Sequence, residues 1–148
     1  MMNDEKLRVL KASSKLSSRT DLETFENILE QVSMADADWL PKLFLVFNDD
    51  CGNDDGMFSL IHTIERFPDS YYVKSFVDHI KSIYENSKYW ASMLFSRIIN
   101  NENCLSEAKK NLRTADRKAI LALLTHMEKD GQFDKRRHIL EDLRKLLE

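Results

Sequence analysis

The chain has 148 residues, of which 43% are hydrophobic and 32% are charged, and its net charge is −3. This length is typical of one domain, and the composition is that of a soluble globular protein. Only three glycines and two prolines are present, which argues against an all-β fold because such folds need many turns. The net charge is too small to indicate that the whole chain binds nucleic acid or a membrane.

Neither the cysteines nor the N-terminal residues indicate secretion. Cys51 and Cys104 are too few and too far apart for a disulfide framework or a zinc site, and free thiols persist in a reducing cytosol. The N-terminal residues lack the apolar core of a signal peptide, and no apolar stretch has the length of a transmembrane helix. We therefore expect a cytoplasmic protein that does not bind membranes.

Apolar residues recur at three- and four-residue steps and predict a succession of helices. We expect the first helix within residues 3–15, the second to begin at a cap on Thr20 or Asp21, and the third to span Trp39–Phe47. The apolar run Leu43–Phe47 also fits a buried strand, because the length of a run does not distinguish the two structures.

The most informative stretch is the helix expected over residues 55–67, which follows an acidic loop of residues 48–54. Two of the three glycines frame the junction between this loop and the helix, and a proline follows the helix. Asp54 and Asp55 suit an N-cap, because a carboxylate accepts the free backbone N–H groups at a helix start. Apolar side chains cover a broad face of the helix, which predicts that it lies in the core.

Five further helices are expected after Pro68. Their ranges are Asp69 or Ser70 to about Glu85, Ser87 to the run Asn100–Asn103, Leu105–Leu112, a cap at Thr114–Arg117 to Asp130–Gly131, and Asp134–Leu147. Eight or nine helices with short connections imply antiparallel hairpins. Because no strict repeat is present, we expect a single all-α domain over residues 1–148, as an irregular α-solenoid or, second, as a compact bundle.

Charge is distributed unevenly along the chain. Residues 34–70 contain eight acidic residues against Lys42 and Arg66, whereas residues 105–148 contain eleven Lys and Arg against eight acids. The acidic set of the middle segment is Asp36, Asp38, Asp49, Asp50, Asp54, Asp55, Glu65 and Asp69. This segment would attract a basic partner. The basic residues near the end are interleaved with acids, which favours a solvated face over a nucleic-acid site.

No arrangement typical of catalysis or metal binding is found. The four histidines lack HxxxH or HExxH spacing, and there is no Gly-rich phosphate loop or nucleophile turn. The acidic loop has the composition of a calcium loop but lacks its alternating ligands and its glutamate at the twelfth position. His62 and Glu65 could form an acid–base pair, but a structural ion pair between Glu65 and Arg97 is the preferred interpretation. We therefore expect no enzyme, metal or cofactor.

Two helical blocks in the middle of the chain carry a resemblance to a known family. The first block is residues 55–67, followed by Tyr72, and the second is Trp90–Asn100. The matching positions are Gly56, His62, Glu65 and Phe67 in the first block and Trp90, Arg97 and Asn100 in the second. These blocks resemble the immunity protein 30 family, small bacterial proteins encoded beside polymorphic toxins, including those of contact-dependent growth inhibition.

The resemblance implies a protein that binds and neutralises the C-terminal domain of a cognate toxin, often a nuclease with a basic cleft, without catalysis or direct contact with nucleic acid. The residues expected to face the toxin are the acidic set Asp36, Asp38, Asp49, Asp50, Asp54, Asp55 and Asp69, with Trp39 and Tyr71 as aromatic anchors. His62, Glu65 and Arg97 are expected to be structural polar residues. The main alternative is a general α-helical adaptor with no toxin partner. The docking face, the choice between plugging an active site and binding beside it, and the oligomeric state stay open.

Overall fold

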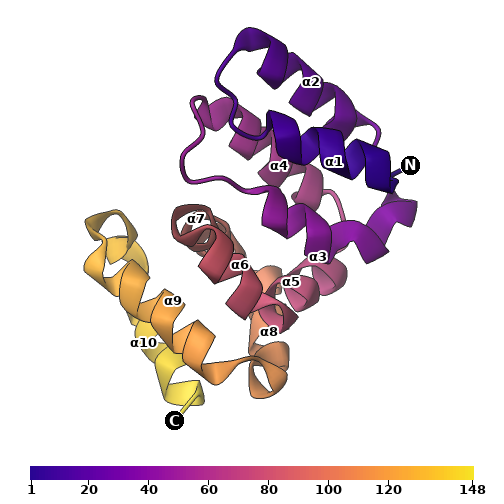
Figure 1. Ribbon diagram of the computed structural model, residues 1–148. Helices are drawn as coiled ribbons and strands as arrows, with labels where there is room; N and C mark the ends of the chain where they lie inside the picture. The colour runs from indigo at the N-terminus through magenta and orange to yellow at the C-terminus, as the bar shows by residue number, and fades with distance from the viewer. The chain divides into compact units, whose positions relative to one another are not determined.

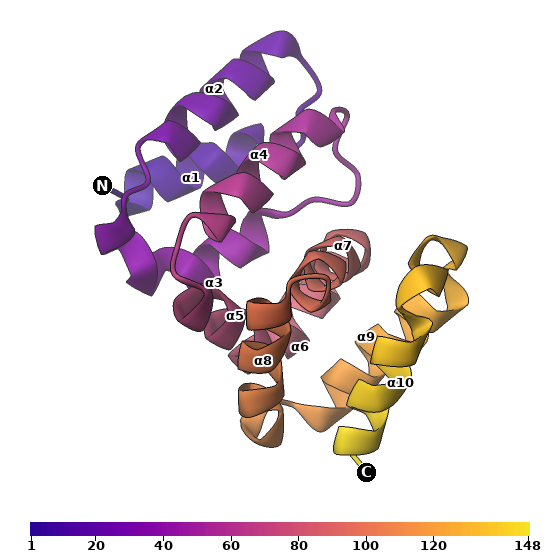
Figure 2. The same cartoon turned by 180° about the vertical axis from the view of Figure 1, so that it is seen from behind.

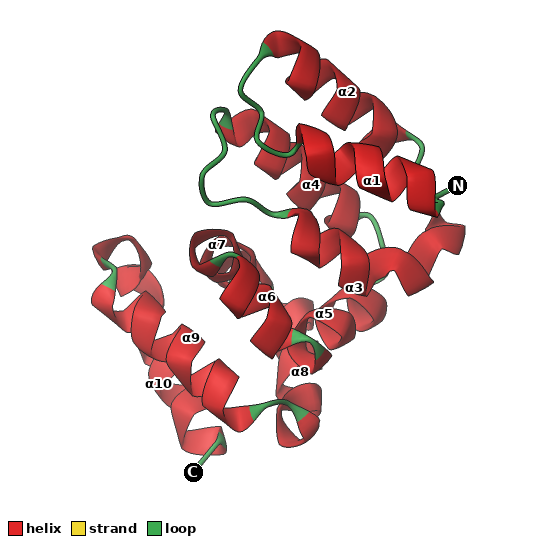
Figure 3. Cartoon of the chain, viewed as in Figure 1, coloured by secondary structure: helices red, strands yellow, loops and turns green.

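The computed structural model describes residues 1–131 and 134–148 with their side chains, and this part of the chain contains helices and no strand (Figure 3). The α-helices are α1 (Asp4–Ser13), α2 (Arg19–Glu30), α3 (Leu40–Leu43), α4 (Asp54–Glu65), α5 (Asp69–Asp78), α6 (Ile80–Asn86), α7 (Lys88–Ile99), α8 (Glu102–Asn111), α9 (Arg117–Lys129) and α10 (Arg137–Leu146). The short 3-10 helices are η1 (Met34–Trp39), η2 (Phe44–Val46), η3 (Leu112–Thr114) and η4 (Gly131–Arg136). The predicted all-α class is confirmed, with ten α-helices in the described chain where eight or nine were expected.

The chain divides into two compact units, Met1–Pro68 and Asp69–Glu148. The first unit contains α1 to α4, in which α2 packs against both α1 and α4 (Figures 1 and 2). In the second unit α5 and α7 pack against α8, and α9 packs against α6, α7 and α10. The single domain over residues 1–148 and its solenoid or bundle arrangement stay predictions.

The first unit is built around α4, whose apolar side chains include the fully buried Met57, Leu60 and Ile61. Helix α2 packs against α4 and contributes the fully buried Phe25 to the same core. Its N-cap is Ser18, whose hydroxyl accepts the N–H of Asp21 at 3.1 Å, so the cap expected at Thr20 or Asp21 is wrong by two to three positions.

The apolar run Leu43–Phe47 is helical up to Val46, and the strand alternative for it is wrong. Its backbone forms the end of α3 and the 3-10 helix η2, and every side chain of the run except Leu45 is buried. A strand would need a neighbouring strand for its backbone hydrogen bonds, and the described residues contain none. The continuous helix expected over Trp39–Phe47 is therefore replaced by the end of η1, by α3 and by η2, and Phe47 lies outside them with φ −55° and ψ 138°.

In the second unit, the long helix expected from Asp69 to Glu85 is broken at His79 into α5 and α6. His79 has φ −112° and ψ 19°, and its ring Nδ1 lies 2.9 Å from the carbonyl oxygen of Ser75. The N-cap predicted for α9 within the Thr114–Arg117 segment is confirmed, because the Asp116 carboxylate accepts the N–H of Ala119 at 3.0 Å.

Two other helix starts in this unit differ from the prediction. Helix α8 begins at Glu102 because the side chain of Asn101 accepts the N–H of Cys104 at 3.0 Å, so the asparagine run begins a helix as well as ending one. The last α-helix begins at Arg137, where a start at Asp134 was expected. Within the described residues, every helix falls short of the combined length and apolarity needed to cross a bilayer.

Candidate functional site

The segment between η2 and the first turn of α4 carries four exposed carboxylates, which we call the acidic surface. Its members are Asp49, Asp50, Asp54 and Asp55. The side-chain oxygen of Asn48 accepts the N–H of Asp50 at 2.9 Å, which forms a turn at the start of the loop. No Lys or Arg of the described chain forms an ion pair with Asp50, Asp54 or Asp55. The described residues also contain no group of three or more His, Cys, Asp or Glu that could hold a metal ion.

Asn53 is the N-cap of α4, which corrects the cap expected at Asp54 or Asp55. Its side-chain oxygen accepts the N–H of Asp55 at 2.9 Å. Asparagine and aspartate are equally good N-caps, so the sequence does not distinguish these adjacent candidates. Because asparagine takes the backbone N–H, both carboxylates stay exposed in the first turn, where the helix dipole favours negative charge.

Cys51 is half-buried beside the acidic surface, and its thiol lies 3.6 Å from the Asp54 carboxylate. Burial, together with the hydrogen bond and the negative charge of Asp54, raises the pKa of the Cys51 thiol. The thiol therefore stays protonated near neutral pH, and the charge of this segment comes from its aspartates.

The acidic loop is held by the turn between α1 and α2, which we call the Leu16 turn (residues 14–17). The N–H of Gly52 donates to the carbonyl oxygen of Lys15 at 2.8 Å. A Cβ atom at Gly52 would lie 2.8 Å from the backbone oxygen of Leu16, and a Cβ atom at Gly56 would overlap the Leu16 side chain. Two of the three glycines thus lie in close approach to one buried leucine, Gly52 against its backbone and Gly56 against its side chain.

Leu16 has φ 50°, the one positive φ of a non-glycine residue in the described chain. This left-handed conformation costs a leucine about 1–2 kcal/mol. Its side chain is only 2% exposed, and full burial of a leucine contributes about 1.5–3 kcal/mol. Burial against Gly56 therefore offsets the backbone strain, and the buried side chain ties the acidic loop to the core of the first unit.

Asp36 is not part of the acidic surface, which corrects its place among the residues expected to face a partner. It is 1% exposed, and its carboxylate accepts the N–H groups of Met2 at 3.0 Å and of Ser33 at 2.8 Å. Burial by itself raises the pKa of Asp36, but these N–H groups and the Ser33 hydroxyl lower it overall. Asp36 is thus a structural carboxylate of η1, ionised at neutral pH.

The other expected partner-binding residues are divided between the two units. Asp38 is exposed on η1, and Trp39 is half-buried with the Lys42 ammonium 4.7 Å from the centre of its ring. Asp69, half-buried, and Tyr71, 55% exposed, lie in the first turn of α5 in the second unit. The first unit therefore brings Asp38 and Trp39 into one compact body with the acidic surface.

The three residues expected to have structural roles also lie in different units, two in the first and one in the second. His62 is exposed on α4 and lines a hollow of about 290 Å³ between α2 and α4, which also includes Arg66. Glu65 is half-buried in the first unit, and Arg97 is exposed on α7 in the second. The ion pair between Glu65 and Arg97 stays a prediction.

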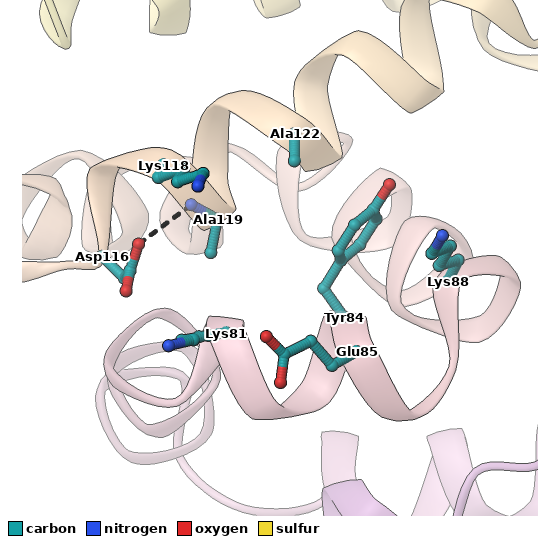
Figure 4. A pocket seen from close by; sticks show the side chains of 8 residues that line it. All are labelled: Lys81, Tyr84, Glu85, Lys88, Asp116, Lys118, Ala119 and Ala122. Carbon is teal, nitrogen blue, oxygen red and sulfur yellow. Dashed lines mark hydrogen bonds between the residues drawn. The ribbon is translucent and has the colours of Figure 1, made fainter.

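Sequence reasoning missed a groove between α6 and α9 in the second unit. One hollow, of about 450 Å³, has Tyr84 and Lys88 in its lining, and Figure 4 shows residues of α6 facing residues of α9 across it. A second hollow, of about 460 Å³, shares Tyr84, Lys118 and Ala122 with the first, so the two are adjacent, and we describe them together as one groove along α9. The available signal was the spacing of Lys81 and Tyr84, which lie three residues apart on one face of α6, whereas Lys88 reaches the groove from the first turn of α7.

Comparison with known proteins gives one family. Residues 12–108 match the family described as immunity protein 30, which is more than half of the chain. The matched residues include the acidic surface and the Leu16 turn, and they end before α9. Searches of curated proteins and of solved structures found no match. The chain therefore belongs to the immunity protein 30 family, and the family implies an immunity protein that acts against a toxin.

Proposed function

We propose that this protein binds the toxin encoded beside its own gene and blocks the toxin domain with the acidic surface. The main observation in support of this proposal is that four carboxylates lie exposed within residues 49–55, on a segment held by the Leu16 turn. The complementary partner is a basic cleft, such as that of a nuclease, in which the aspartates take the place of nucleic-acid phosphates. Such inhibition requires no catalytic group in the immunity protein.

Electrostatics supports this choice of partner. Four like charges on a short segment raise the local negative potential and speed the encounter with a basic surface, by about ten- to a thousand-fold for strongly steered pairs. Exposed charges of this kind contribute more to the rate of association than to the lifetime of the complex. Asp38 and Trp39 in the same unit would extend the contact, with Trp39 as an anchor once Lys42 moves away from its ring.

The anchoring of the acidic loop supports the same proposal. A mobile loop would lose conformational freedom on binding, at a cost of about 1–2 kcal/mol for each ordered residue. The hydrogen bonds from Gly52 to Lys15 and from Asp50 to Asn48 already restrict this loop in the free protein. The acidic surface is therefore preorganised for a rigid partner. If the toxin acts on nucleic acid, we expect the complex to form in the cytoplasm.

The direct test is co-expression of this protein with the product of the neighbouring upstream gene. We expect expression of the neighbour's C-terminal domain alone to arrest growth, and co-expression to restore growth and yield a stable complex on purification. Nucleic acid extracted from the arrested cells should be degraded if the toxin is a nuclease. An unrelated helical protein of similar size serves as the control.

A neighbour that is harmless, or one that is toxic but neither bound nor neutralised, would reject the immunity proposal. The general helical adaptor would then be the better interpretation. A toxin that is neutralised while nucleic acid stays intact would keep immunity and reject the nuclease.

A further inference from the structure

The groove between α6 and α9, which we call the Tyr84 groove, is unlike the acidic surface in charge. Its rims carry four exposed lysines, Lys81, Lys88, Lys118 and Lys129. Its two carboxylates are Glu85 and Asp116, and Asp116 is engaged in capping α9. No ion pair holds any of these four lysines within the described residues. The groove therefore presents a net positive charge that the protein itself does not neutralise.

The floor of the Tyr84 groove is apolar and aromatic. Ala119, Ala122 and Leu121 line it from α9, and the Tyr84 ring rises from α6 toward that helix (Figure 4). The Tyr84 ring makes an edge contact with His126, at 6.2 Å between ring centres, and lies 5.8 Å from the Lys88 ammonium. Burial raises the pKa of Tyr84, so its hydroxyl keeps its proton and can donate to a carboxylate.

The elongated shape of the Tyr84 groove indicates that its ligand is a segment of polypeptide or nucleic-acid chain rather than a compact small molecule. Its two hollows follow α9 from Lys118 to Lys129, and the rise of an α-helix between these two residues is about 16 Å. This length accommodates about three turns of a helix or about five residues of extended chain. Grooves of this kind, with an apolar floor and charged rims, accept amphipathic segments of partner proteins.

The chemistry of the rims favours a polypeptide over nucleic acid. A phosphate backbone carries a charge on every nucleotide and would meet Glu85 and Asp116 in any register, whereas a polypeptide can place its acidic side chains opposite the lysines alone. An apolar floor between cationic rims matches a segment in which acidic side chains flank an apolar one. We propose that the Tyr84 groove docks an acidic segment of the toxin, with an apolar side chain of that segment seated against Tyr84 and Ala122.

This proposal rests on the proposed function, because it assigns a second contact to the same partner. The two surfaces would bind opposite charges: the acidic surface a basic cleft, and the Tyr84 groove an acidic segment outside that cleft. The second half of the groove, on α9, lies beyond the residues that match the family. The groove would therefore help this chain to recognise its own toxin rather than a relative's.

The test uses full-length protein and the co-purified toxin domain. The variant replaces Lys81, Lys118 and Lys129 by glutamine, which removes three rim charges from exposed positions. The matched control replaces Lys109, Arg113 and Lys145 by glutamine, three exposed cations of the same unit that do not line the groove. We expect the groove variant to raise the Kd for the toxin about tenfold or more, and the control to change it less than twofold. Glu85→Gln should lower the Kd, because it removes a carboxylate that repels the acidic segment.

The outcomes separate the two proposals. A neighbour that does not bind the wild-type protein rejects the proposed function. Tight binding that is equal for wild type, groove variant and control retains the function and overturns the groove proposal. A short single-stranded DNA provides a further check. If the groove variant loses affinity for this DNA while its affinity for the toxin stays unchanged, the groove proposal is also overturned.

Discussion

At the residue scale, Leu16 couples the helical hairpin of the first unit to its acidic loop. The left-handed backbone at Leu16 is tolerated because its side chain is buried over Gly56, and the same turn accepts the hydrogen bond from Gly52 through Lys15. Gly56 was one of the positions on which the family resemblance rests. The structure supplies a physical reason for glycine there, since any side chain would meet the buried leucine.

Replacing Gly56 by alanine should destabilise the protein by about 1–3 kcal/mol, because the new methyl group overlaps the Leu16 side chain. The same change removes a helical glycine, which by itself would stabilise α4 by about 1 kcal/mol. Urea unfolding of Gly56→Ala in the wild-type and Leu16→Ala backgrounds separates the two effects. The substitution should be destabilising in the first background and neutral or stabilising in the second. A stabilised Gly56→Ala single variant would contradict the predicted overlap.

At the element scale, caps decide where helices begin, and they also decide which charges stay available. Asn53 caps α4 and leaves the neighbouring carboxylates exposed, whereas Asp116 caps α9 and is partly withdrawn from the Tyr84 groove. The break at His79 separates α5 from α6, so that Lys81 and Tyr84 lie on a short helix of their own that packs against α9. No proline or glycine marks this break in the sequence.

Replacing Asn53 by alanine should lower the free energy of unfolding by about 1 kcal/mol, because a backbone N–H of α4 loses its acceptor. Asn53→Asp should retain most of the stability, since aspartate caps equally well. Asp55→Ala should cost less, about 0.3–1 kcal/mol, from the lost interaction with the helix dipole. Thermal unfolding of the three variants measures these differences. A larger loss for Asp55→Ala than for Asn53→Ala would favour the sequence-based cap.

At the scale of the whole molecule, the small net charge is the sum of two units of opposite charge. Residues 1–68 contain 13 acidic residues against seven Lys and Arg, a net charge of −6, whereas residues 69–148 contain 12 against 15, a net charge of +3. The two proposed contacts follow this division, with the acidic surface in the first unit and the Tyr84 groove in the second. A partner that meets both must itself carry separate basic and acidic regions.

Replacing Asp49, Asp50, Asp54 and Asp55 by asparagine should slow association with the toxin about tenfold or more at low salt, because steering is lost. The dissociation rate should change much less. At about 0.5 M salt the wild-type and variant association rates should converge, since screening acts within a few ångströms. The control with the same change in charge replaces Glu102, Glu141, Asp142 and Glu148, exposed acids of the second unit, by their amides. Equal association rates for the two variants at low salt would reject steering by the acidic surface.

Local sequence patterns determined the helical class, most helix positions and the cap at Asp116. They did so because the three- and four-residue periodicity and the capping side chains act within a few residues. The family followed from two short blocks for the same reason, since local motifs are visible without the fold. Prediction failed where neighbouring residues offered equivalent choices, as at Ser18 and Asn53, or where no local signal exists, as at His79.

The sequence by itself thus determined that this is an all-α protein of the immunity protein 30 family with an acidic middle segment. Only the tertiary structure decided that Asp36 is buried while Asp49 and Asp50 are exposed, because exposure depends on packing against distant residues. The tertiary structure also brought Leu16 to Gly56 and Tyr84 to α9, across about 40 and 35 residues of chain. No local pattern reports such contacts, since they form only when whole helices pack together.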